Sequence, residues 1–138
     1  MAEPVIIGSE NKFIKAATNK AMTLYNVTSE PGGTYTALCN TGTTSYQVPV
    51  GKTFRILGID IWGTNTSFGA VQLWEHSSAG TAGGTMVFDT ENATDTNAKI
   101  QTLPHFQTYI EITTGNYINF YLEQARQYCI IYGVEDDA

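Results

Sequence analysis

The histidines and carboxylates of this chain are the residues best suited to metal binding or acid–base chemistry. His76 follows Glu75 directly, so on a β-strand the two side chains point to opposite faces. A site built from two histidines and one carboxylate needs closely spaced histidines on one face. The second histidine, His105, instead follows Pro104 in a predicted loop. The spacing therefore argues against a catalytic metal.

Cleavage of a glycosidic bond would need two carboxylates about 5–9.5 Å apart. Asp60 and Glu111 occupy polar positions of alternating segments, where exposure to solvent is the usual reason for a charge. The sequence also lacks a serine nucleophile turn, a cysteine close to a histidine and a phosphate-binding loop. We therefore predict no enzyme activity, no metal and no cofactor. The carboxylates considered were Asp60, Glu75, Asp89, Glu91, Glu111 and Glu123.

Tryptophan and tyrosine side chains form a second set with a chemical use. They alternate with apolar residues or border such segments, so they are predicted to point away from the protein core. Outward aromatic rings suit subunit interfaces, sugar platforms or plain cross-strand pairs. We favour an interface and keep the other two alternatives open. The candidates are Trp62, Trp74, Tyr109, Tyr117 and Tyr121.

Two segments with one pattern indicate how these side chains are held. Val48–Ile56 and Ile112–Phe120 each contain an apolar strand end, a glycine and a strand with alternating apolar residues. Gly51 and Gly115 would supply the positive φ of a tight turn. We interpret the segments as matching β-hairpins. They predict an all-β, jelly-roll-like antiparallel sandwich.

The strongest predicted strand, Thr53–Gly63, changes its alternation at Gly58. A β-bulge there would keep the apolar residues on both sides of it on the core face. Ser77–Gly84 is rich in Gly, Ser, Ala and Thr and predicts a flexible loop. The predicted core consists of Phe54, Ile56, Ile59, Ile61, Val71, Leu73, Ile110, Ile112, Ile118, Phe120 and Leu122.

Length and charge limit the function classes. A chain of 138 residues is most simply one domain, and its charged residues amount to 14%, against about 25% in ordinary domains. The net charge is −6, and the seven Lys and Arg residues are scattered. Binding to nucleic acid usually needs a basic stripe. We therefore expect no nucleic-acid partner.

The first 21 residues are predicted to form an N-terminal arm, and residues 22–138 the sandwich domain. The arm begins without a signal peptide and the chain has no apolar run of about 20 residues, so we expect synthesis in a cytoplasm and no membrane partner. Cys39 and Cys129 are expected to be buried free thiols, with a disulfide as the alternative. The arm carries a short apolar patch that fits a partner surface: Pro4, Val5, Ile6 and Ile7.

Two stretches resemble segments of small virion proteins of tailed bacteriophages. They are SYQVPVGKTFRILGIDIW, which begins at Ser45, and TTGNYINFYLEQARQYCIIYGVE, which begins at Thr113. Capsid cement (decoration) proteins and some head-fibre or tail-spike domains have such turns and strands. The resemblance implies a jelly-roll subunit, commonly a homotrimer, that binds the major capsid protein on the virion exterior. The alternative it leaves is a receptor- or carbohydrate-binding fibre or tail module.

Overall fold

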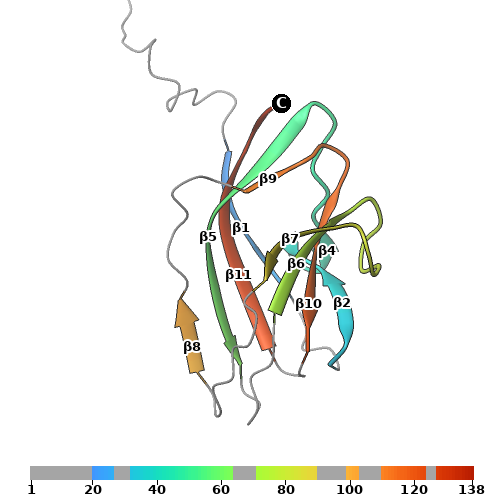
Figure 1. Ribbon diagram of the computed structural model, residues 1–138. Coiled ribbons are helices and arrows are strands. Elements are labelled where there is room, and N and C mark those ends of the chain that lie inside the picture. The colour runs from blue at the N-terminus through green and yellow to red at the C-terminus, as the bar shows by residue number, and fades with distance from the viewer. Residues whose placement is uncertain (1–19, 27–31, 64–70, 90–98, 103–109, 124–126) are drawn as a thin grey trace, which may run out of the picture.

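A computed structural model describes residues 20–26, 32–63, 71–89, 99–102, 110–123 and 127–138, and these residues form strands and turns without a helix (Figure 1). The strands are β1 (Lys20–Tyr25), β2 (Thr34–Ala37), β3 (Cys39–Thr41), β4 (Thr44–Ser45), β5 (Lys52–Gly63), β6 (Val71–His76), β7 (Thr85–Asp89), β8 (Lys99–Thr102), β9 (Ile110–Ile112), β10 (Tyr117–Leu122) and β11 (Gln127–Asp137). The described residues contain no helix long and apolar enough to cross a membrane.

The strands form two antiparallel sheets. The first sheet runs β4-β3-β1-β11-β5-β8, with β9 also paired to β5. The second sheet runs β2-β10-β6-β7. The order β1-β11-β5-β8 facing β2-β10-β6-β7 is the double Greek key of a jelly roll (Figure 1). The predicted fold class is therefore confirmed, and β3 and β4 extend its first sheet.

The two matching segments are not hairpins, so that prediction is wrong. β9 belongs to the first sheet and β10 to the second, and the turn between them crosses from one sheet to the other. The two turns pair with each other instead: Val48 N–H donates to Asn116 O at 2.9 Å, and Gly115 N–H donates to Val48 O at 2.7 Å. Gly51 and Gly115 both have φ of 81°, as expected for the turns. Alternation identifies strands and turns, but it does not identify the partner of a strand.

The core lies between the two sheets. All the predicted core residues are buried except Ile110, which is partly buried against the cluster. Residues that the alternation did not single out complete the core: Leu24, Leu38, Tyr46, Val48, Cys129 and Ile131. Cys39 and Cys129 are buried free thiols, and burial raises the pKa of both.

The β-bulge lies where the sequence predicts it. Tyr132 pairs with Gly58 and Gly133 pairs with Ile56, so Leu57 is the extra residue of β5 and its side chain is 43% exposed. The extra residue shifts the side-chain alternation by one position. The apolar residues on both sides of the bulge therefore share the core face. Gly133 leaves room for Phe54, since a Cβ on Gly133 would lie 2.4 Å from the Phe54 ring.

Candidate functional site

The structure separates the predicted site residues between the two sheets. Trp62 lies on β5 of the first sheet, whereas Trp74 lies on β6 and Tyr117 and Tyr121 lie on β10 of the second sheet. All of these side chains are partly exposed, in agreement with the predicted outward direction. Five of the predicted residues lie outside the described residues: Pro4, Val5, Ile6, Ile7 and Tyr109.

The outer face of the first sheet carries an apolar stripe along its central strand β11. In β11 the residues Cys129 and Ile131 point into the core, so the residues between and beyond them point outward. We call the outward set, together with the neighbouring tryptophan of β5, the outer stripe: Trp62, Tyr128, Ile130, Tyr132 and Val134. An antiparallel sheet with one solvated face normally alternates apolar with polar residues, so this outward run is unusual.

Two contacts organise the outer stripe. Trp62 stacks on Tyr128, with ring centroids 5.6 Å apart and planes 19° apart. The Tyr132 hydroxyl donates to Asp60 Oδ2 at 2.7 Å, and this bond raises the pKa of Tyr132. Tyr132 remains 37% exposed. Tyr128 and Tyr132 were not predicted as site residues, although they alternate in the sequence with Cys129 and Ile131.

The outer face of the second sheet holds a different aromatic group. Tyr35 of β2 lies 4.8 Å from Tyr121 and 6.1 Å from Trp74, measured between ring centroids. The Trp74 indole N–H donates to Gln72 Oε1 at 2.9 Å. Tyr35 and Gln72 were not predicted. Tyr35 lies in the Thr-Tyr-Thr segment of the short strand β2. That segment is too short for alternation to show which face of the sheet the tyrosine occupies.

A glycine-rich loop is fixed beside these rings. Asn119 of β10 points away from the core, yet it is fully buried because residues 77–84 cover it. Its Oδ1 accepts from Gly80 N–H at 2.9 Å, and its Nδ2 donates to Ser78 O and Thr81 O, each at 3.1 Å. Asn119 therefore anchors residues 78–81 of the loop, a contact that the composition of the loop did not reveal, and the flexibility of the loop stays a prediction.

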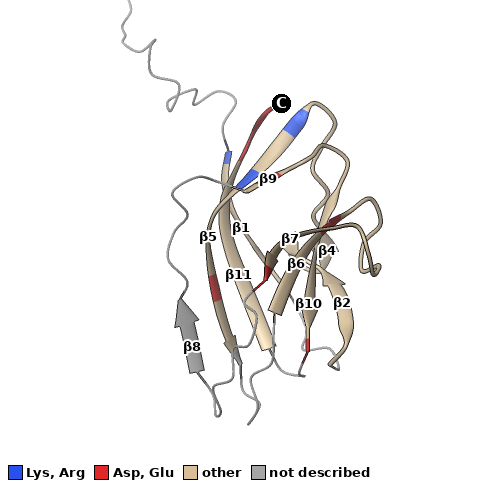
Figure 2. Cartoon of the chain, viewed as in Figure 1, with Lys and Arg blue, Asp and Glu red and all other residues tan. Residues whose placement is uncertain are grey.

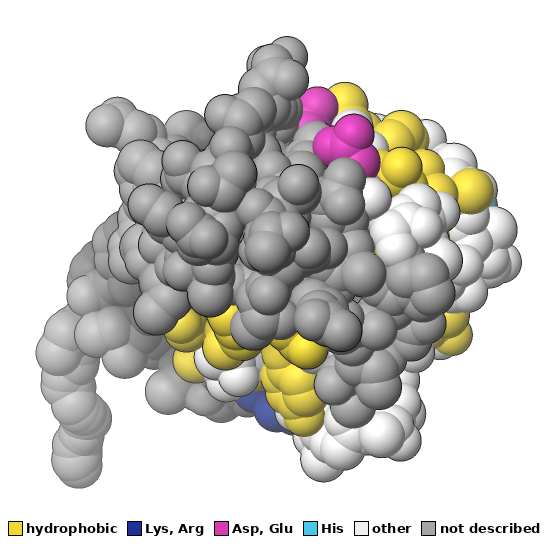
Figure 3. Space-filling model, turned by 90° about the horizontal axis from the view of Figure 1, so that it is seen from below, with side chains coloured by type: hydrophobic (Ala, Val, Ile, Leu, Met, Phe, Trp, Pro, Cys, Tyr) yellow, Lys and Arg dark blue, Asp and Glu magenta, His cyan; other side chains and the backbone are white. Residues whose placement is uncertain are grey.

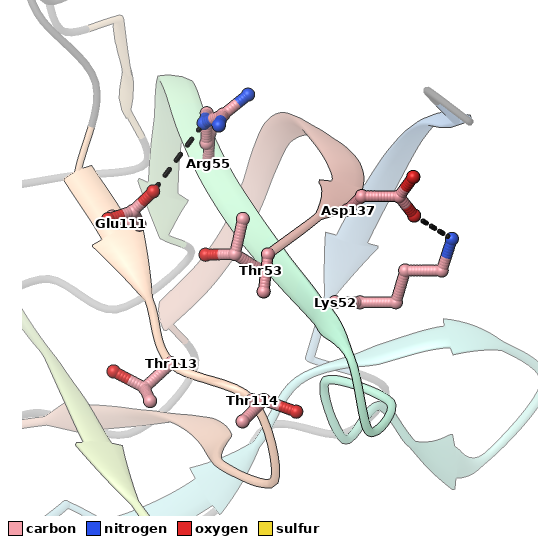
Figure 4. A pocket seen from close by; sticks show the side chains of 8 residues that line it. Lys52, Thr53, Arg55, Glu111, Thr113, Thr114 and Asp137 are labelled. Atoms are coloured by element: carbon pink, nitrogen blue, oxygen red, sulfur yellow. Dashed lines mark hydrogen bonds and ion pairs between the residues drawn. The ribbon is translucent and has the colours of Figure 1, made fainter.

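Charged residues gather at one end of the first sheet (Figure 2). Lys52 Nζ lies 2.7 Å from Asp137, and Arg55 lies 2.9 Å from Asp136 and 3.6 Å from Glu111. Lys52, Arg55, Glu111 and Asp137 line a hollow of about 230 Å³, and Figure 4 shows two of the pairs beside it, Lys52 with Asp137 and Arg55 with Glu111. The bond to Asp137 raises the pKa of Lys52. Each charge in the hollow has an opposite partner, an arrangement that ties strand ends together.

The residues considered for catalysis have structural partners. Asp60 accepts from Tyr132, as described above, and Glu75 accepts from Thr113 N–H and from Asn116 Nδ2. His76 Nδ1 accepts from Ser78 N–H at 2.8 Å. Within the described residues, no group of three or more His, Cys, Asp or Glu side chains could hold a metal ion. Glu91 and His105 lie outside the described residues.

Glu135 and Asp136 are buried carboxylates that the sequence pattern did not single out. Glu135 points into the sandwich and accepts from the Tyr46 hydroxyl at 2.9 Å. Burial, followed by this bond, raises the pKa of Tyr46 strongly. Glu135 shares the alternation phase of Cys129 and Ile131, and that phase was the available signal. Its partner is 89 residues away, which no local pattern indicates.

Comparison of the chain with protein-family models, curated proteins and solved structures finds no match. The site must therefore be interpreted from its own surfaces. On the face shown in Figure 3, the coloured side chains are mostly hydrophobic or uncharged, with few charged groups among them.

Proposed function

We propose that this chain is a non-enzymatic virion structural protein that binds and stabilises the outer surface of a tailed-bacteriophage capsid as a homotrimer. The resemblance of the segments that begin at Ser45 and Thr113 motivates the proposal. The jelly-roll strand order supports it, although a fold by itself does not specify a function.

The outer stripe is the observation that carries the proposal. A central strand with four successive outward positions occupied by Tyr128, Ile130, Tyr132 and Val134 offers an apolar surface for another protein. Burial of such a surface contributes about 25 cal/mol per Å². In a closed symmetric oligomer the stripe would face a neighbouring subunit or the shell.

Light scattering on the purified protein tests the stripe. We expect a mass three times that of the 15.1 kDa chain. Tyr132→Lys places a positive charge within the outer stripe, where the Asp60 carboxylate can form an ion pair with it. The variant should therefore fold, but as a monomer. Thr85→Lys, at an exposed position of β7, is the matched control and should stay trimeric. A monomeric wild-type protein at micromolar concentration would contradict the trimer.

Cosedimentation with empty capsids of the virus that encodes the chain tests the capsid partner. The wild type and Thr85→Lys should pellet with the shells, and Tyr132→Lys should stay in the supernatant. A wild-type trimer that never pellets would reject the capsid role while leaving the oligomer intact.

The N-terminal arm belongs to the same proposal. Pro4–Ile7 carries consecutive apolar side chains that would contact the shell across a subunit junction, favouring the assembled lattice by mass action. Deletion of Met1–Gly8 should leave the melting temperature unchanged and abolish pelleting with capsids. Loss of folding together with binding would instead assign the arm to the core of its own sandwich.

A further inference from the structure

The outer face of the second sheet aligns aromatic and polar side chains across all its strands. The strand register places Tyr35 beside Tyr121, Tyr121 beside Gln72, and Gln72 beside Asp89. Trp74 follows Gln72 on the same outward side of β6 and contacts both Gln72 and Tyr35. We call these five residues the mixed cluster.

The mixed cluster combines the two kinds of group that hold a sugar ring. Partly exposed aromatic faces can pack against the C–H groups of a pyranose, while amide and carboxylate groups bond its hydroxyls. The bond from Trp74 to Gln72 Oε1 fixes the amide of Gln72. Its NH₂ group is thereby turned away from the indole, as a donor for a ligand. Asp89 is exposed at the end of β7.

The charge of this face selects among ligands. Within the described residues, the strands of the second sheet contain no Lys or Arg, whereas Asp89 contributes a negative charge at the cluster. The whole chain carries a net charge of −6. A phosphate, sulfate or carboxylate on a ligand would be repelled, whereas a neutral ligand would not.

The neighbouring loop gives the cluster a fixed border. The three hydrogen bonds of Asn119 hold residues 78–81 on the row next to Tyr121, and Asn119 lies opposite Trp74. Because Asn119 already holds the loop in this position, binding would not have to order the loop.

We propose that the mixed cluster is a binding site for a neutral saccharide, whose pyranose ring packs on Trp74 or Tyr121 and whose hydroxyls bond Gln72 and Asp89. The site lies on the opposite sheet from the outer stripe. The saccharide proposal can therefore be confirmed or rejected independently of the capsid proposal.

A printed array of neutral saccharides and of their sialylated and sulfated counterparts tests the site with the full-length protein. We expect binding to neutral members of the array. Trp74→Ala should weaken that binding about tenfold or more, as for a central aromatic contact. Val50→Ala removes a 93% exposed apolar side chain just before β5, outside both the mixed cluster and the outer stripe, and is the control that should bind like the wild type.

Gln72→Leu keeps the volume at position 72 and removes the donor, so it tests the site even if Trp74→Ala folds poorly. We expect a similar loss of binding with an unchanged melting profile. An array without signal would overturn the proposal. So would preference for the anionic saccharides, or unchanged binding in Gln72→Leu and in a folded Trp74→Ala.

Discussion

The outer faces of the two sheets carry similar aromatic residues with different neighbours. On the first sheet, Trp62 and Tyr128 stack beside aliphatic side chains, and the one described polar contact within the stripe joins Tyr132 to Asp60. On the second sheet, the rings stand beside an amide and a carboxylate, and a fixed loop borders them. The neighbours decide what an outward ring can bind: a continuous apolar stripe suits a protein surface, and a mixed cluster suits a hydroxylated ligand.

The largest loss of stability should come from a change in the core that the two sheets share, and it should affect both outer faces. Ile59 is 1% exposed and belongs to the hydrophobic cluster between the sheets. Ile59→Ala should lower the free energy of unfolding by about 2–5 kcal/mol, because it removes buried methyl groups and leaves a cavity. Urea denaturation followed by fluorescence measures this change. A loss below about 0.5 kcal/mol would contradict the packing described for this position.

A smaller loss of stability should come from a change at Gly133 of β11, and it should disturb the first sheet more than the second. A Cβ on Gly133 would lie 2.4 Å from Arg55 O and equally close to the Phe54 ring, directly beneath the outer stripe. Gly133→Ala should therefore cost about 1–3 kcal/mol by overpacking. We expect weakened self-association in light scattering and unchanged saccharide binding. Gly42→Ala, at a turn position with open space, is a control for the loss of a glycine, although its φ of 57° adds local backbone strain.

Sequence alternation predicted the fold well where contacts are local. The bulge at Gly58 and the burial of Phe54 and Ile61 follow from the phase of one strand, and Gly115 follows from the geometry of one turn. These features depend on neighbours in the sequence, and periodicity records such neighbours.

Long-range partners were beyond the reach of the same patterns. The pairing of the two glycine turns, the bond from Tyr46 to Glu135 and the anchoring of the loop by Asn119 join residues 38–89 positions apart. The outward direction of Trp62 and Trp74 was predicted, but their separation onto different sheets depends on strand order. No alternation pattern contains that order, because it results from how the whole chain packs.

Release of the glycine-rich loop should have the opposite selectivity. It should impair the outer face of the second sheet and leave the outer face of the first sheet unchanged. Asn119→Ala removes the three hydrogen bonds to Gly80, Ser78 and Thr81. The loop residues are exposed, so water can replace part of these bonds, and we expect a cost of about 1–2 kcal/mol. Hydrogen exchange at the Gly80 amide should accelerate, and saccharide binding should weaken. Trimer mass should not change, and a monomeric variant would contradict the independence of the two faces.

The smallest effect should come from one hydroxyl on the outer stripe. Tyr132→Phe keeps the exposed ring and removes the bond to Asp60, so stability at pH 7 should change by less than about 0.5 kcal/mol. Self-association should persist, because an apolar stripe does not need the hydroxyl. Loss of the trimer in this variant would show that the interface depends on the polar contact.

The Tyr132 hydroxyl also makes the unfolding free energy depend on pH, and the direction of that dependence follows from its pKa. Its bond to Asp60 raises the pKa of Tyr132 above the ordinary tyrosine value of about 10. A raised pKa in the folded state means that the bond contributes fully below pH 10, and that its contribution is lost as the pH rises through the raised pKa. Solvent screening keeps the contribution small at this exposed position. The difference in unfolding free energy between the wild type and Tyr132→Phe should therefore be constant from pH 7 to pH 9 and shrink above pH 10. Urea titrations at pH 7, 9 and 11 measure it, and a difference that grows with pH would contradict the assigned bond.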